Sequence, residues 1–136
     1  QAGRAGLPER GPKVDPAGAR RRTEVLELFT RAGLEGPDPQ KLFTTPADKR
    51  LYEELLKEGL LVRVKFDLAI SAAAETRLRE FLAAHARSGK MLAIADLKIA
   101  LGLSRKWAVP LLEYCDMKHW TIRAGDARKI LPAVDG

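Results

Sequence analysis

The clearest structural pattern in this chain lies in residues 104–131, which read SRKWAVPLLEYCDMKHWTIRAGDARKIL. Ser104 is predicted to cap the start of a helix. Small and apolar residues then recur at helical spacing and predict one buried stripe: Ala108, Leu111, Leu112 and Cys115. Residues 120–123 and 127–131 are two strand-prone runs around Gly125-Asp126, a turn-forming pair. The pattern therefore predicts a helix followed by a β-hairpin.

The residues before this stretch predict two further helices. Ser71 begins the first, which ends near Ser88-Gly89. Its apolar stripe is Ala74, Leu78, Phe81, Leu82 and His85. A short strand is predicted at residues 91–93 and a second helix at residues 94–101, ended by Gly102. Three helices and a hairpin are the pattern of a winged helix, a helix-turn-helix unit with an added β wing.

The first half of the chain repeats this order. A helix begins at Asp15-Pro16, with Val25, Leu28, Phe29 and Ala32 as its predicted buried stripe. A short helix follows at residues 40–43, and a third runs from a cap at Thr45 to Gly59 with Leu51, Leu55 and Leu56 facing inward. Residues 60–64 and 67–70 alternate with a period of two and predict a hairpin.

The fold class is therefore mainly α with small β wings (α+β), arranged as tandem winged helices. We expect a first winged helix at residues 15–70, a second at 71–131 and a tail at 132–136. Residues 1–14 are rich in Gly and Pro and are interpreted as a linker or a remnant of a preceding domain. A start without methionine fits a fragment of a longer chain.

The composition narrows the classes of function. The 136 residues contain 24 Lys and Arg against 18 Asp and Glu, a net charge of +6 that suits a polyanionic partner. One cysteine, Cys115, and two histidines, His85 and His119, exclude a disulfide framework and a metal cage built from several of either residue. No nucleophile with a nearby base and no phosphate-binding glycine loop is present. We expect a soluble, intracellular binding protein, not an enzyme, with no metal and no membrane span.

Five cations of the second unit are predicted to converge. Arg105 and Lys106 open the third helix, while Arg123, Arg128 and Lys129 lie on the following hairpin. In a winged helix these two elements lie side by side, so the cations are predicted to form a binding site for a sugar-phosphate backbone. Amides at the helix start add hydrogen-bond donors for the phosphate oxygens. The alternative interpretation is a set of ordinary solvated charges. Cations at a helix start oppose the helix dipole, however, which favours a functional reason for their position.

The same residues resemble a known family. The run from Leu103 to Tyr114, LSRKWAVPLLEY, with Asp116 and then TIRAGDAR at residues 121–128, resembles the C-terminal winged-helix domain of the bacterial selenocysteine-specific elongation factor SelB. The resemblance covers about residues 15–131 and is strongest at 102–131. It is long and ungapped through the third helix. Trp107 and Trp120 stand where smaller or other apolar residues are common in the family, so base stacking by either is not implied.

The resemblance implies a role in selenocysteine incorporation. The full-length factor is a cytoplasmic GTPase that delivers selenocysteinyl-tRNA to the ribosome, and its last winged helix binds the SECIS hairpin of the mRNA. The RNA-binding positions carried over by motif, with Lys129 adjacent, are Ser104, Arg105, Lys106, Arg123, Gly125, Asp126 and Arg128. Of these, Arg105, Lys106, Arg123 and Arg128 are assigned to phosphates, and Gly125-Asp126 to the shape of the wing tip or to an exposed base. GTP and Mg belong to a domain absent from this sequence, so no cofactor is expected here, and we expect a monomer.

Two other functions stay open. A DNA-binding winged-helix transcription regulator would use the same electrostatic attraction, although Glu113 on the outer face of the third helix would repel phosphate in a groove. A protein-interaction scaffold would instead show an exposed apolar patch and bind with weak dependence on salt. A comparison of hairpin RNA with duplex DNA at two salt concentrations separates these alternatives.

Overall fold

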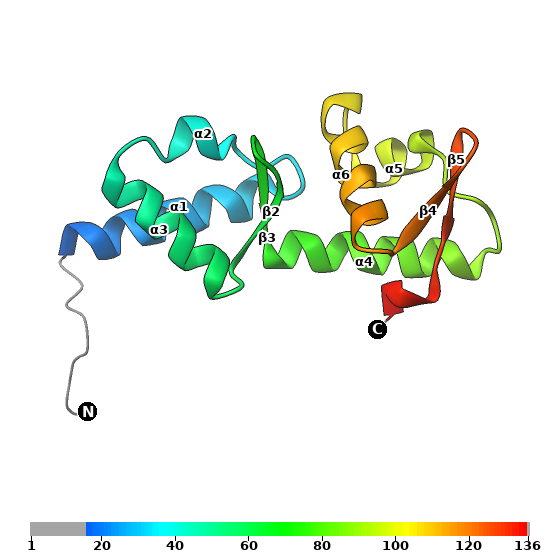
Figure 1. The fold of residues 1–136 in the computed structure, drawn as a ribbon, viewed down its shortest axis with the longest axis horizontal. Coiled ribbons are helices and arrows are strands. Elements are labelled where there is room, and N and C mark those ends of the chain that lie inside the picture. Colours follow the sequence, from blue (N-terminus) through cyan, green and yellow to red (C-terminus); the bar gives the residue numbers. More distant parts are fainter. Residues whose placement is uncertain (1–15, 136) are drawn as a thin grey trace.

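The structure, a computed structural model, describes residues 16–135, and its elements follow the predicted order (Figure 1). The first unit contains α1 Pro16–Ala32, α2 Pro39–Leu42, α3 Pro46–Lys57, β2 Leu61–Lys65 and β3 Leu68–Ser71. The second contains α4 Ala72–Arg87, α5 Ile94–Leu101, α6 Arg105–Met117, β4 Thr121–Ala124, β5 Ala127–Ile130 and the 3₁₀ helix η1 Pro132–Asp135. The tandem winged-helix fold is confirmed.

Two helix starts are capped where the sequence predicts it. The Thr45 hydroxyl accepts a hydrogen bond from the Asp48 amide at 3.1 Å, and the Ser71 hydroxyl accepts one from the Ala74 amide at 3.1 Å. Each cap satisfies a backbone donor that has no partner inside its helix. The predicted cap at Asp15 and the predicted linker at residues 1–14 lie outside the described residues.

Three local predictions need correction. Leu28 is 43% exposed, because the buried stripe of α1 is centred on Val25 and Phe29 and turns toward the partly buried Leu26. Residues 91–93 do not form a strand of their own, and within the described chain Leu92 makes an isolated β-bridge to Arg128. The expected tail at 132–136 includes η1, which packs on α4.

The packing of η1 explains why the chain stays folded past the second wing. Val134 is 3% exposed and belongs to the hydrophobic core of the second unit. Its carbonyl oxygen accepts a hydrogen bond from the Arg79 guanidinium of α4 at 3.0 Å. Burial of one apolar side chain and one charge-assisted hydrogen bond fix this turn against α4.

Both wings are antiparallel hairpins with defined register. Strands β2 and β3 pair Leu61 with Ser71 and Val62 with Ile70, and the register shifts between Arg63 and Lys65. Strands β4 and β5 pair regularly from Thr121–Ile130 to Ala124–Ala127. Since directly opposed residues of an antiparallel pair point to one face, these registers determine which side chains each wing turns toward the helices.

The hairpin of the first unit is packed between both units. Ala69 belongs to the core of the first unit, whereas its neighbours Leu68 and Ile70 belong to the larger core that includes Leu111 and Leu112 of α6. Successive side chains of a strand point to opposite faces, so β3 is buried on both of its faces. The predicted boundary at residues 70 and 71 therefore separates two elements that share one continuous core.

This packing places α6 between the two wings. Strands β2 and β4 both contact α6. Figure 1 shows α6 standing between the two hairpins, with its start and both hairpin turns on the same upper side of the molecule. Among residues 16–135, no helix is both long and apolar enough to span a membrane.

Candidate nucleic-acid interface

The start of α6 offers free backbone donors beside two cations. Ser104 occupies the cap position with extended backbone (φ −82°, ψ 165°), yet among the described residues its hydroxyl makes no capping hydrogen bond. Arg105 and Lys106 form the first turn and are both exposed. The first amides of a helix have no acceptor within the helix and carry the positive end of its dipole. This end of α6 therefore combines side-chain and backbone groups that attract an anion.

Lys106 and Trp107 are packed against each other at this start. The Lys106 ammonium lies 5.1 Å from the centroid of the Trp107 indole, within the range of a cation–π interaction. Trp107 is half-buried and packs against the core of the second unit. The indole thus supports the Lys106 side chain while leaving its ammonium in solvent.

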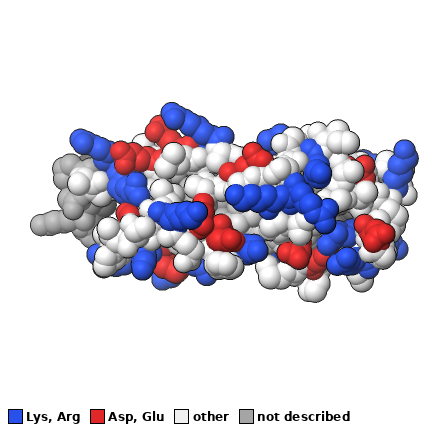
Figure 2. Space-filling model, turned by 90° about the horizontal axis from the view of Figure 1, so that it is seen from above, with Lys and Arg blue, Asp and Glu red and all other residues white. Residues whose placement is uncertain are grey.

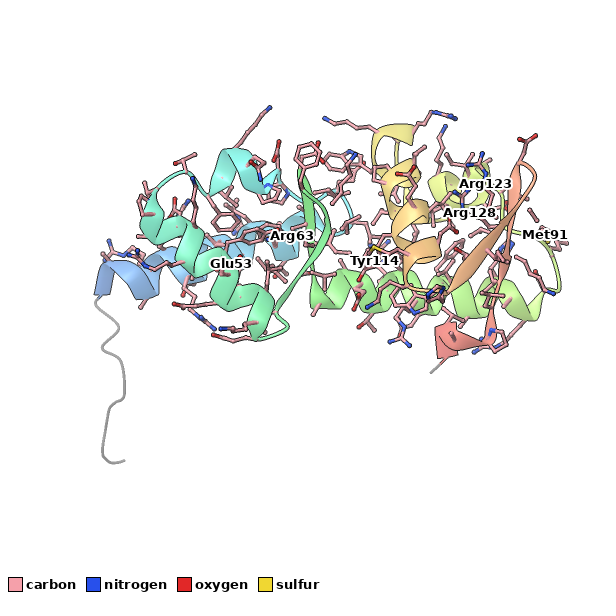
Figure 3. All side chains as sticks on the ribbon, viewed as in Figure 1. Glu53, Arg63, Met91, Tyr114, Arg123 and Arg128 are labelled. Carbon is pink, nitrogen blue, oxygen red and sulfur yellow. The ribbon has the colours of Figure 1, made fainter. Side chains whose placement is uncertain are left out.

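The second wing presents its cations on two different faces. Arg123 is opposite Arg128 in the register, and Ile122 is opposite Lys129. Arg123 and Arg128 therefore share the face that turns toward α6, where Figure 3 shows them close together, and Lys129 points to the outer face with the exposed Ile122. The five predicted cations consequently do not form one uniform cluster.

Arg128 forms an ion pair with Asp116, whereas we expected its guanidinium to be available for an RNA phosphate. Its Nε lies 3.2 Å from each carboxylate oxygen of Asp116, and a terminal nitrogen lies 3.1 Å from Oδ2. The Arg128 side chain is 12% exposed and the Asp116 side chain 29%. The Thr121 hydroxyl donates a further hydrogen bond to Asp116 at 2.6 Å. This network joins the end of α6 to both strands of the wing.

The turn of the wing is held by local geometry. Gly125 has a positive φ of 65°, a conformation that favours glycine, and the Arg123 Nε donates to its carbonyl oxygen at 3.3 Å. Asp126, the second residue of the turn, is exposed. The predicted turn pair Gly125-Asp126 therefore forms the wing tip, with the exposed guanidinium of Arg123 folded against its backbone.

These parts meet on one side of the molecule. The start of α6 and the β4–β5 turn both lie on the upper side of Figure 1. Figure 2 looks onto that side and shows a run of Lys and Arg side chains across its middle. Ser104, Arg105, Lys106, Arg123 and the wing tip are exposed there, in contrast to Arg128.

Trp120 and Tyr114 serve the core beneath this surface. Trp120 is 6% exposed and meets the Tyr114 ring edge-on at 5.7 Å between centroids. The Tyr114 hydroxyl donates to Glu75 of α4, and burial together with this carboxylate raises the pKa of the phenol. Trp120 is therefore a residue of the core. Tyr114 was absent from the predicted stripe, because its position in the helical period lies at the margin of the apolar face.

The cysteine and the two histidines considered in the sequence analysis lie in the folded core or next to helix ends. Cys115 is fully buried, and this burial, with nearby Asp116, raises the pKa of its thiol to about 12. His85 is half-buried, and its Nε2 lies 3.1 Å from the Met91 carbonyl oxygen. His119 follows α6 with a positive φ of 63°. Within residues 16–135, no three His, Cys, Asp or Glu side chains are grouped so that they could hold a metal ion.

Comparison with known proteins agrees with this fold. Residues 84–130 match the family model described as elongation factor SelB, winged helix. A selenocysteine-specific elongation factor from Desulfomicrobium baculatum is 30% identical over 118 residues, which cover 80% of this chain and 18% of that protein. The chain thus spans less than a fifth of the length of this relative.

Two solved structures share the architecture. The mRNA-binding domain of elongation factor SelB from E. coli, in complex with SECIS RNA, superimposes with a TM-score of 0.65 at 17% identity, over 82% of this chain and 98% of that one. A bacterial selenocysteine-specific elongation factor, EF-Sec, has a TM-score of 0.63 at 23% identity, over 82% of this chain and 18% of that one. The matching family model describes a winged helix rather than a GTPase domain. The chain is therefore a C-terminal winged-helix region of the SelB family, in which residues 84–130 match the family's winged-helix model.

Proposed function

We propose that this chain is the mRNA-binding module of a selenocysteine-specific translation elongation factor and that it recognises a SECIS hairpin. The observation that carries the proposal is the start of α6, where exposed Arg105 and Lys106 stand beside amides that no side chain of the described chain caps. The E. coli domain of the same fold is in complex with SECIS RNA. In the full-length cytoplasmic factor, the GTPase activity would belong to another domain, and the ribosome and selenocysteinyl-tRNA would be partners of the whole factor.

The contacts divide between phosphate and base. Arg105, Lys106 and Arg123 contact phosphates, because their charged groups are exposed on the side of the molecule that carries the wing tip. The Ser104 hydroxyl and the first amides of α6 donate to phosphate oxygens. The wing tip at Gly125-Asp126 meets an unpaired base or the curve of the RNA loop, since loops present bases that paired regions hide.

Arg128 takes a different part in this proposal. Its bidentate contact with Asp116 positions the wing against α6, so it supports binding without neutralising a phosphate. Lys129 on the outer face contacts a phosphate where the RNA passes around the wing. Glu113 is exposed on α6 and disfavours a groove-filling mode on duplex DNA, so the helix start, rather than its length, meets the RNA.

A binding titration tests the proposal. A pool of hairpin RNAs with a randomised loop is enriched on the wild-type chain, and its strongest binder is compared with duplex DNA of equal length at two salt concentrations. We expect tighter binding of the hairpin, with an affinity that falls steeply with salt. Arg105→Ala should weaken binding by about 1–3 kcal/mol, because phosphate contacts dominate affinity, and should lower the salt slope by about one.

The matched control is Arg20→Ala, which removes an exposed arginine near the start of α1, at the far end of the molecule (Figure 1). This variant should bind as the wild type does. Equal affinity for hairpin RNA and duplex DNA, or equal losses in the Arg105 and Arg20 variants, would contradict the proposal.

A further inference from the structure

The turn of the first wing carries an aromatic side chain that the protein core does not use. We define the first wing tip as residues 65–67, which are Lys65 at the end of β2 and the two turn residues Phe66 and Asp67 before β3. Phe66 is 66% exposed, whereas Val64 and Leu68 on either side of the tip are buried in the core. An exposed phenyl ring contributes little of the hydrophobic free energy that its burial would add to the stability of the fold.

The first wing tip is held in a defined orientation. The Gln40 side chain of α2 donates a hydrogen bond to the Phe66 carbonyl oxygen at 3.2 Å. The Lys65 ammonium lies 5.7 Å from the Phe66 ring centroid and 4.0 Å from the Asp67 carboxylate. Next to Gln40, Lys41 is exposed and adds a further positive charge. An aromatic ring beside a cation is the kind of arrangement that single-stranded nucleic acid binds, with bases stacked and phosphates neutralised.

The position of the first wing tip relates it to the candidate interface. Val64 and Leu68, at the base of the tip, share a core with Leu111 of α6, and β2 contacts α6 directly. The tip, the start of α6 and the tip of the second wing all lie on the same side of the molecule (Figure 1). The shared core holds the first wing against the helix whose start would contact the RNA.

We infer that the first wing tip is a second RNA-binding site, at which Phe66 stacks on an unpaired base and Lys65 contacts an adjacent phosphate. This inference rests on the proposed function, because the same RNA would extend from the start of α6 to the first wing. The start of α6 thus lies between two contact points, one supplied by each unit. Stacking on a ring is tolerant of base identity, so this site adds affinity more than sequence specificity.

The test uses the hairpin enriched on the wild-type chain, extended at both ends by unpaired arms of about ten nucleotides. Phe66→Ala should weaken binding about 5- to 150-fold without changing the salt slope, because a base stack is lost and no charge is removed. Phe66→Trp should retain or raise affinity, since indole stacks at least as well. Lys65→Ala should reduce the salt slope by about one.

Met117→Ala is the matched control, because Met117 is similarly exposed, at 61%, but lies at the opposite end of α6 from its start. It should bind as the wild type does. A Phe66→Ala variant with wild-type affinity, or an equal loss in the Met117 variant, overturns the inference while the Arg105 result still supports the proposed function. Failure of the wild-type chain to prefer the hairpin RNA overturns both. The inference is also overturned if Phe66→Ala loses affinity but Phe66→Leu binds as the wild type does, since leucine lacks a stacking face.

Discussion

Replacing Arg128 should separate the positioning of the wing from direct contact with RNA. Arg128→Ala removes a guanidinium that makes three contacts of 3.1–3.2 Å with Asp116, while Lys129→Ala removes the neighbouring charge from the outer face of the same strand. Both variants reduce the net charge by one. They differ in whether the lost charge has a partner inside the fold.

The magnitude follows from the burial of the pair. Removing one partner of a fully buried ion pair costs about 3–5 kcal/mol, and an exposed pair contributes about 0–1 kcal/mol. With side-chain exposures of 12% and 29%, the Arg128–Asp116 pair lies between these limits, and the Thr121 hydroxyl still partners Asp116 after the change. We therefore expect a loss of about 2 kcal/mol in the free energy of unfolding, or a fall of about 6–10 °C in Tm. Lys129→Ala should change the free energy of unfolding by less than about 0.5 kcal/mol.

The assay combines thermal unfolding, followed by circular dichroism, with RNA titrations at several salt concentrations. Arg128→Ala should bind more weakly with an unchanged salt slope, because the wing shifts but no phosphate contact is removed. Lys129→Ala should retain its Tm and lower the slope by about one. If both variants unfold at the wild-type temperature and both lower the slope equally, Arg128 contacts phosphate directly and the positioning argument fails.

Three further outcomes follow from the packing. Gly36→Ala should lower the free energy of unfolding, measured by chemical denaturation, by about 3 kcal/mol, because the added Cβ would lie 1.9 Å from the Ala69 carbonyl oxygen. Gly33→Ala places its Cβ in open space but at a φ of 60°, and should lower it by about 1 kcal/mol. Folding raises the pKa of the Cys115 thiol from 9.0 to about 12, so the unfolded chain loses this proton at a lower pH than the folded chain does. The free energy of unfolding should therefore fall as the pH rises from about 9 to 12, by up to about 1.4 kcal/mol per pH unit. Cys115→Ala should show a shallower fall, and an identical slope would contradict the assignment. Tyr114→Phe removes the hydrogen bond to the α4 carboxylate and should lower the free energy of unfolding by about 1 kcal/mol while RNA affinity, measured at a temperature where both proteins are folded, stays unchanged.

The predicted helices and hairpins agree with the structure because the signals that define them act over a few residues. A cap such as Thr45 acts on an amide three positions away, and the stripe from Ala108 to Cys115 repeats with the helical period. Where a prediction was wrong, the arrangement of elements distant in the sequence explains the difference. Leu28 satisfies the helical spacing, but the elements around α1 leave that side of the helix in solvent.

The candidate site was predictable in its residue types and less so in their roles. The sequence places Arg105 and Lys106 at a helix start, and the structure finds both exposed there. Arg128 and Lys129 are adjacent cations with the same pattern in the sequence, yet one pairs with Asp116 and the other faces solvent. Phe66 carried no signal, because an apolar residue beside two strands is expected to be buried.

Short-range periodicity and turn chemistry in the sequence determined two sets of three helices with a hairpin, as well as the basic start of the last long helix. Tertiary packing decided that β3 is buried on both faces, that one face of the first hairpin joins the core of the second unit, and that α6 stands between two wings. The physical reason is the range of the forces involved. Backbone hydrogen bonds and caps are satisfied within a few residues, whereas the partner of a buried apolar face or of a charged side chain is whichever distant group the closed fold brings against it.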